Sequence, residues 1–260
     1  RFDNLHQYAC DSNNFWPQVR EEIKHIPEAF EQIQSTGKLQ WVDHVEFISD
    51  IPGKNDGSEG IGGGGVTTDA LIKLIKQAKD SIIIQSPYLI TTLLGKKLFL
   101  ETVKRGVKIK ILTNSLASTD NLQAFNGYQR DRIALLLTGV RIYEFKPDAA
   151  IRLKILTGAL QKKLNHVPIF GLHAKSMVID GKITVIGTFN LDPRSANLNT
   201  ECITVIHSEK IANDVQLEML EEIKPENAWE TTMRFNPDSK STLKKNLKSA
   251  AMKIVPKGIL

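Results

Sequence analysis

The 260-residue sequence has little cysteine, no long apolar run and no long internal repeat. Its two cysteines, Cys10 and Cys202, are too few for the disulfide framework of a small secreted protein, so we expect free thiols. The longest apolar runs, such as IALLL at 133–137, fall far short of the roughly 20 residues that cross a bilayer, and we expect no transmembrane segment. The absence of long repeats excludes solenoids and propellers.

What is present is an ordinary globular composition, with 41% hydrophobic and 24% charged residues. The net charge of +5 is a modest basic bias, which suits anionic lipid head groups or nucleic acid without selecting either. The sequence starts at Arg1, with neither an initiator methionine nor a signal sequence. We therefore expect the chain to be a piece of a longer protein.

From residue 66 onward, apolar residues alternate between helical and strand spacing, which predicts an α/β fold. Helices are expected over 67–80, where a threonine should cap the helix, over 91–106 and over 121–139. Strands are expected within 81–90, 107–114 and 140–147. Three more strands and a closing helix follow, up to residue 223.

We divide the chain into a lead-in (1–65), an α/β lobe (66–223) and a basic C-terminal extension (224–260). The lead-in combines polar helices up to residue 40, a strand within 41–53 and seven glycines between Gly53 and Gly65. That run lacks the G-x-x-x-x-G-K-[ST] pattern of a phosphate loop, so we interpret it as a mobile linker. The extension combines an irregular stretch with a short basic helix, which either docks on the lobe or lies on an anionic membrane surface.

The most informative stretch is LHAKSMVIDGKITVIGTFNLDPRSANLNTE, residues 172–201. It contains the pattern H-x-K-x4-D-x6-G-T-x-N, formed by His173, Lys175, Asp180, Gly187, Thr188 and Asn190. Asp180-Gly181 between two β-branched runs predicts a β-hairpin. Because alternate residues of a strand share a face, His173 and Lys175 should point the same way, roughly 7 Å apart along the backbone. By the same parity, Thr188 and Asn190 share a face where the hairpin ends.

These residue types suit the chemistry of a phosphodiester. The imidazole of His173 can attack phosphorus or protonate a leaving alkoxide, and Lys175 supplies positive charge to the non-bridging oxygens. Thr188 and Asn190 can donate hydrogen bonds to the same oxygens. We expect Glu201 to accept a hydrogen bond from the far ring nitrogen of His173 and so to fix its tautomer.

The parity of Asp180 leaves two roles open for it. Its side chain has the opposite parity to His173, so it is either a turn residue that fixes the hairpin or an electrostatic group behind the contacting side chains. A metal site would compete for the His, Asp and Glu set, but the ammonium of Lys175 beside His173 repels a divalent cation. We therefore expect neither a metal nor another cofactor.

The pattern resembles the HKD motif of the phospholipase D superfamily at all six positions, with Thr188 in place of the usual serine. The following segment, NLDPRSANLNTE, is similar to the extension of bacterial cardiolipin synthases and their phospholipase D-like relatives. The resemblance implies a phospholipase D-like lobe with a mixed central sheet flanked by helices, phospholipid substrates and a phosphohistidine intermediate without metal. It also implies that Tyr88 and Asn114, at the expected strand ends, line the substrate pocket; ordinary strand-end turns are the alternative.

Transfer through a phosphohistidine needs a nucleophile and an acid on opposite sides of phosphorus, and one hairpin supplies only one histidine. None of the other histidines begins an H-x-K: His6, His25, His44, His166 and His207. The site is therefore completed either by a second HKD lobe ahead of Arg1 or by a homodimer. In the first case the resemblance makes His173 the general acid and base of a phosphatidyl-transferring enzyme, bound peripherally to a bacterial membrane.

The homodimer alternative corresponds to a metal-independent nuclease. Nucleic-acid binding predicts a dense basic stripe with stacking aromatic residues, whereas the basic residues of this sequence are spread out. We therefore expect a lipid substrate rather than nucleic acid. A non-catalytic lobe is a third possibility, which the completeness of the motif opposes.

Overall fold

A computed structural model of the chain describes residues 24–35, 40–54, 62–151 and 171–251, with six single positions closer to the start (7, 8, 11, 13, 17 and 21). Two compact units are present, Arg1–Asp43 and His44–Leu260. In the first unit, helix α3 (Ile26–Ser35) confirms the helical expectation for part of the lead-in. Residues 55–61 of the glycine run, with two of its seven glycines, lie outside the described residues, so the mobile linker stays a prediction.

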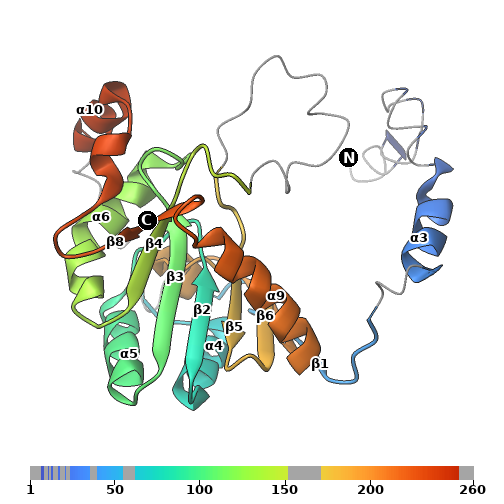
Figure 1. Cartoon of the computed structure of the whole chain (residues 1–260). Coiled ribbons are helices and arrows are strands. Elements are labelled where there is room, and N and C mark those ends of the chain that lie inside the picture. The colour runs from blue at the N-terminus through green and yellow to red at the C-terminus, as the bar shows by residue number, and fades with distance from the viewer. Residues whose placement is uncertain are drawn as a thin grey trace. The chain divides into compact units, whose positions relative to one another are not determined.

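The second unit is organised around one eight-stranded mixed sheet (Figure 1). Its strands are β1 (Val45–Ser49), β2 (Ser81–Gln85), β3 (Lys108–Asn114), β4 (Arg141–Phe145), β5 (Ser176–Ile179), β6 (Ile183–Gly187), β7 (Cys202–His207) and β8 (Ala228–Thr231). Their order across the sheet is β1-β7-β6-β5-β2-β3-β4-β8. β2, β3 and β4 run parallel to one another, and the other neighbouring pairs are antiparallel. The predicted α/β fold with a mixed sheet is confirmed.

Helices pack on both faces of the sheet, because successive side chains of a strand point to opposite sides. The helices are α4 (Val66–Gln77), α5 (Leu93–Lys104), α6 (Leu122–Leu136), α8 (Pro193–Asn197), α9 (Glu209–Glu222) and α10 (Leu243–Ala251). On one face, Ile82 and Ile84 of β2 belong to a core shared with α4, α5 and α6. Ile83, between them, packs against α9 on the other face. Among the described residues, no helix combines the length and apolarity that a bilayer span requires.

The C-terminal extension contains more regular structure than we expected. Part of the segment predicted to be irregular forms β8, which pairs with β4 at the sheet edge, and a 3-10 helix, η3 (Pro237–Lys240), follows it. The buried Glu144 of β4 accepts a hydrogen bond from Thr231 Oγ1 at 2.8 Å and so ties β8 to the sheet. With β1 at the opposite edge, the sheet extends beyond residues 66–223 on both sides.

The predicted hairpin is confirmed, with a small correction at its start. Asp180 and Gly181 have φ angles of 54° and 63°, the left-handed conformation that a tight two-residue turn requires. The carboxylate of Asp180 accepts hydrogen bonds of 2.8–3.0 Å from the backbone N–H groups of residues 79–81. Strand β5 begins only at Ser176, so His173 and Lys175 lie in the segment ahead of the strand and not within it.

Candidate active site

His173 and Lys175 meet at the entrance to β5. Lys175 Nζ lies 3.3 Å from His173 Nε2 and donates a hydrogen bond of 3.0 Å to the backbone carbonyl of His173. The imidazole is exposed, while the lysine is half-buried. The spacing thus brings the two side chains together as predicted, although the segment that carries them precedes the strand. A base or nucleophile and a cation are placed side by side at the surface of the domain.

The segment that carries His173 is fixed by Asn114, the last residue of β3. Asn114 Oδ1 accepts a hydrogen bond of 2.8 Å from the N–H of Leu172, and its Nδ2 donates one of 2.9 Å to the carbonyl of the same residue. The amide therefore imitates a neighbouring strand for the residue directly before His173. Ser118 Oγ donates a third hydrogen bond, of 3.2 Å, to Asn114 Oδ1. Asn114 is buried and its amide binds the backbone of Leu172, so its expected place in the lining of the substrate pocket stays a prediction.

Thr188 and Glu201 form the second part of the site. Thr188 Oγ1 donates a hydrogen bond to Glu201 Oε2 and accepts one of 3.0 Å from the N–H of Cys202. The other oxygen of Glu201 accepts a hydrogen bond of 3.3 Å from Asn199 Nδ2. The carboxylate thus orients the hydroxyl of Thr188, and the expected bond from Glu201 to His173 is not among the contacts of the described residues.

Asn190 and Asp180 differ in their distance from this centre. The backbone N–H of Asn190 lies 3.2 Å from Ser195 Oγ, and its buried Oδ1 has no hydrogen-bond partner among the described residues. Because this oxygen accepts but does not donate hydrogen bonds, it does not test the predicted donation by Asn190 to substrate oxygens, which stays a prediction. Asp180 lies at the opposite end of β5 from Lys175 and is occupied by backbone N–H groups. Of the two roles left open for Asp180, the structure favours the turn residue.

Three acidic side chains act electrostatically on Lys175. Burial lowers the pKa of Lys175, while the negative charges of Glu201, Asp192 and Asp120 oppose that shift. Tyr88 belongs to the same region, since its hydroxyl lies 3.5 Å from both carboxylate oxygens of Asp120. Burial and the charge of Asp120 raise the pKa of Tyr88, so the phenol stays protonated and can donate a hydrogen bond. The substrate contact of Tyr88 stays a prediction, and sequence reasoning did not name Asp120 or Asp192, which no motif position marks.

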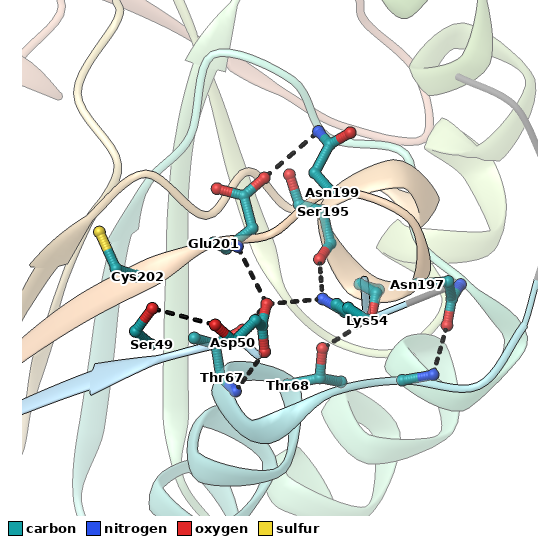
Figure 2. Close-up of polar contacts among 12 residues, drawn as sticks. Ser49, Asp50, Lys54, Thr67, Thr68, Ser195, Asn197, Asn199, Glu201 and Cys202 are labelled. Carbon is teal, nitrogen blue, oxygen red and sulfur yellow. Dashed lines mark hydrogen bonds and ion pairs between the residues drawn. The ribbon is translucent and has the colours of Figure 1, made fainter. Parts of the chain in front are cut away.

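A buried carboxylate at the end of β1 holds the Glu201 side of the site (Figure 2). Asp50 accepts hydrogen bonds from Lys54 Nζ at 2.8 Å, from the N–H and Oγ1 of Thr67 at 2.9 and 2.8 Å, and from the N–H of Glu201 at 3.0 Å. The N–H of Asp50 in turn donates to the carbonyl of Glu201 at 2.8 Å. Lys54 Nζ also donates to the carbonyl of Ser195 at 2.8 Å. The backbone on both sides of the predicted site residues is thereby fixed.

The contacts of Asp50 with Lys54, Thr67 and Glu201, here called the Asp50 hub, also explain why α4 lacks the threonine cap that we expected. The residue before the helix is Gly65, which has no side chain to cap it, and Thr67 lies within the first turn. Asp50 caps the helix from outside, because its carboxylate accepts a hydrogen bond from the free N–H of Thr67 in the first turn. Burial acts to raise the pKa of Asp50, but the hydrogen bonds from Lys54, Thr67 and Glu201 hold it below its ordinary value.

Two further contacts brace α8 against the start of α4. Thr68 Oγ1 donates a hydrogen bond of 2.8 Å to the carbonyl of Ala196, and the N–H of Gly64 donates one of 3.1 Å to Asn197 Oδ1 (Figure 2). Residues 190–201 are therefore a braced segment and not a free loop.

The eight-stranded mixed sheet and the paired histidine and lysine agree with the resemblance to the phospholipase D superfamily that the sequence indicated. The family model described as "Cardiolipin synthase, PLD-like domain" matches residues 71–223. The chain therefore belongs to this family of the phospholipase D superfamily, whose members are phosphodiesterases and phosphatidyltransferases.

Individual relatives agree with this assignment. Cardiolipin synthase C of Escherichia coli K12 is 38% identical over 185 residues, which cover 69% of this chain and 37% of the relative. An uncharacterised protein of Helicobacter pylori J99 is 32% identical over 211 residues, or 81% of this chain and 38% of the relative. The crystal structure of phosphatidylserine synthase from Haemophilus influenzae Rd KW20 shares the fold, with a TM-score of 0.52 at 14% identity, over 98% of this chain and 60% of that one. The chain thus spans little more than a third of the curated relatives.

Proposed function

We propose that the chain is one lobe of a phospholipase D-type enzyme that transfers or hydrolyses the phosphatidyl group of phospholipids, as in cardiolipin synthesis. The observation that carries the proposal is the pair of His173 and Lys175, held by Asn114 on one side and accompanied by the Thr188–Glu201 contact on the other. Membership of the PLD-like domain family of cardiolipin synthase supports a lipid diester as the substrate.

The reaction takes two displacements at phosphorus. In the first, an imidazole nitrogen forms a bond to phosphorus, the bond to the leaving alcohol breaks, and a second histidine gives that oxygen a proton. In the second, the same histidine removes a proton from water or an alcohol, whose oxygen attacks the phosphohistidine and releases the first imidazole. Water yields phosphatidic acid, and an alcohol yields a new phospholipid. The resemblance gives His173 the acid and base role and a partner histidine the nucleophilic one.

The neighbours of His173 have separate tasks in these steps. Lys175 balances charge that builds up on the non-bridging oxygens, and we assign to the amide of Asn190 a hydrogen bond donated to the same oxygens. We assign to Tyr88, whose phenol stays protonated, a hydrogen bond donated to the substrate. The hydroxyl of Thr188 is already turned toward Glu201, so we assign it the role of fixing the glutamate beside Lys175.

The exposed imidazole supports a half-site that a second lobe completes. His173 is open to solvent on this chain, and no other histidine of the sequence is followed by the H-x-K spacing. The matched regions make up only 37% and 38% of the two relatives, which leaves room in proteins of that length for a second HKD lobe. We therefore assign the second histidine to another lobe, with a second copy of this chain as the alternative that the experiment below distinguishes.

Helix α10 supports contact with an anionic membrane. Leu243 and Leu247, one turn apart, are 76% and 64% exposed, and Lys244 and Lys248 beside them are also exposed. The helix is attached near the site, because Lys245 Nζ donates hydrogen bonds of 2.8 Å to carbonyls in the loop before Asp120. Each basic residue near an anionic surface contributes about 1 kcal/mol to binding. We assign α10 to peripheral binding at the rim of the site.

The test combines sedimentation of the 260-residue chain with diesterase assays in chelator, using phospholipid vesicles and DNA as separate substrates. We expect an inactive monomer, and activity on lipid, without metal, once the second lobe is present. In that complete enzyme His173→Asn should abolish turnover, and Lys175→Ala should lower it by about 10²–10³-fold. A monomer that cleaves diesters unaided would contradict the half-site. A dimer that cleaves DNA and not lipid would contradict the lipid substrate.

The membrane assignment has its own control. Leu243→Ser and Leu247→Ser should weaken sedimentation with anionic vesicles, whereas Leu217→Ser should not, although Leu217 on α9 is equally exposed at 66%. Equal binding of the three variants would show that α10 does not contact the membrane.

A further inference from the structure

Two histidines and a glutamate converge where β1 begins. Val45 of β1 pairs with Ile206 of β7, so His44 lies opposite His207, and the N–H of His207 donates a hydrogen bond of 3.1 Å to the carbonyl of His44. Glu46 lies two residues along the same strand and therefore on the same face as His44. Glu46 Oε1 is 3.0 Å from His207 Nε2 and 3.5 Å from His44 Nε2. Three donor atoms are thus gathered by paired strands whose backbones fix them.

In the part of the chain that the structure describes, no lysine or arginine forms an ion pair with Glu46. Among the described residues, its ion-pair partners are the two imidazoles, and its cross-strand neighbour Val205 is buried and apolar. A carboxylate bonded to one imidazolium is a common surface pair. An ordinary surface pair does not explain why two imidazole nitrogens approach the same oxygen of Glu46, since one protonated ring is enough to neutralise the carboxylate.

We propose that His44, Glu46 and His207 bind a divalent transition-metal ion of the zinc class. Zn²⁺ takes imidazole nitrogen and carboxylate oxygen at about 2.0–2.1 Å, which places the donors of a tetrahedron about 3.3 Å apart. The two nitrogen–oxygen distances, 3.0 and 3.5 Å, lie on either side of that value. The rings are stacked at 4.0 Å and 10°, so a tilt of each ring is needed to direct both lone pairs at one ion. A water molecule would take the fourth position.

The site has a structural task separate from phosphodiester chemistry. β1 is one of the two edge strands of the sheet, and among the described strands it pairs only with β7, so a metal shared by β1 and β7 would secure that edge. His44 lies at the start of β1, whereas Asp50, which contacts Glu201, follows its end. The inference is therefore independent of the proposed reaction, in which Lys175 supplies the cation.

The experiment titrates the chelator-stripped chain with ZnCl₂ by calorimetry and with Co²⁺ by absorption spectroscopy. We expect one ion per chain, a tetrahedral cobalt spectrum and a higher unfolding temperature with zinc. Glu46→Gln and His207→Gln should each weaken binding by more than about tenfold, because each removes one of three ligands. His25→Gln is the matched control, since His25 Nδ1 is paired with Glu28 at 2.8 Å in the first unit.

Three results would overturn the site. One is zinc binding by both ligand variants with the affinity of the parent chain, and another is equal weakening by His25→Gln. The third is a folded parent chain that binds no zinc and gives no tetrahedral cobalt spectrum. Because the cobalt spectrum is recorded on the parent chain, it shows whether the site binds metal even where a variant folds poorly.

Discussion

Replacing Asp50 with asparagine tests the hub that holds the Glu201 side of the site. The substitution keeps the size of the side chain but removes its charge, so the ammonium of Lys54, whose side chain is only 3% exposed, loses its counter-ion. Removing one partner of a buried ion pair costs about 3–5 kcal/mol. The asparagine amide also faces donors from Thr67 and Glu201 with only one acceptor oxygen. We therefore expect Asp50→Asn to lower the free energy of unfolding by about 4 kcal/mol.

Urea unfolding measures this loss, and the double variant Asp50→Asn/Lys54→Met identifies its origin. With no buried cation left, the double variant should recover about 2 kcal/mol relative to the single one. Acid unfolding gives a second readout. The folded pKa of Asp50 is lowered, so its contribution is complete above the unfolded pKa of about 3.9 and is lost as the pH falls through the folded value. Asp50→Asn should lack this part of the acid transition.

Either of two results would show that the Asp50–Lys54 ion pair does not stabilise the domain as proposed. A loss below about 1 kcal/mol in the single variant would mean that Lys54 is solvated in solution and that the hub contributes little. A double variant no more stable than Asp50→Asn would mean that the unpaired ammonium is not the cause of the loss. In the complete enzyme, turnover of the Asp50→Asn variant should also be lower than that of the parent, because Glu201 loses its contact with the Asp50 carboxylate. The assay is run at low temperature, where the variant stays folded.

Asn114→Ala leaves the N–H and C=O of Leu172 unpaired in a buried place, so unfolding free energy should fall by about 2–5 kcal/mol in urea titrations; no change would show that Leu172 finds other partners. Burial raises the pKa of Glu144 to about 7 in spite of Arg132, so stability should decrease by about 3 kcal/mol as the pH rises from about 4.5 to 7. Glu144→Gln should flatten this dependence, and parallel slopes for the two proteins would contradict it. Because the pKa of Lys175 is lowered, the ammonium loses its proton at a lower pH than an ordinary lysine, whose pKa is about 10.4. We therefore expect kcat/KM of the complete enzyme to decline at a pH below about 10.4. Lys175→Arg should move that decline upward, unless another group sets it.

Local signals in the sequence were sufficient for most of the elements. The Asp180-Gly181 pair predicted the β5–β6 hairpin, because only residues that tolerate positive φ fit such a turn. Apolar spacing likewise predicted α4, α5 and α6. The pairing of His173 with Lys175 was also predictable, since residues two apart share a side in any extended segment, whether or not it is a strand.

The contacts that hold the site were not predictable in the same way. Asn114 and Leu172 are 58 residues apart, and Asp50 and Glu201 are 151 apart, so no local pattern links them. In the sequence, Asp50 precedes a Pro-Gly turn and looks like a solvated loop residue. β8 was missed for a related reason, because its four residues become a strand only through their pairing with β4.

The long-range bond between Asp50 and Glu201 has a consequence for how the chain folds. β1 is synthesised before β7, with which it pairs, and the two strands lie about 150 positions apart. Pairings of such high sequence separation slow folding, because the entropy of closing the loop is lost before the contacts form. The parallel unit β2–β3–β4 can assemble first, from neighbouring segments. The braced active-site segment is then among the last parts of the domain to form, and an incomplete chain cannot yet present the site.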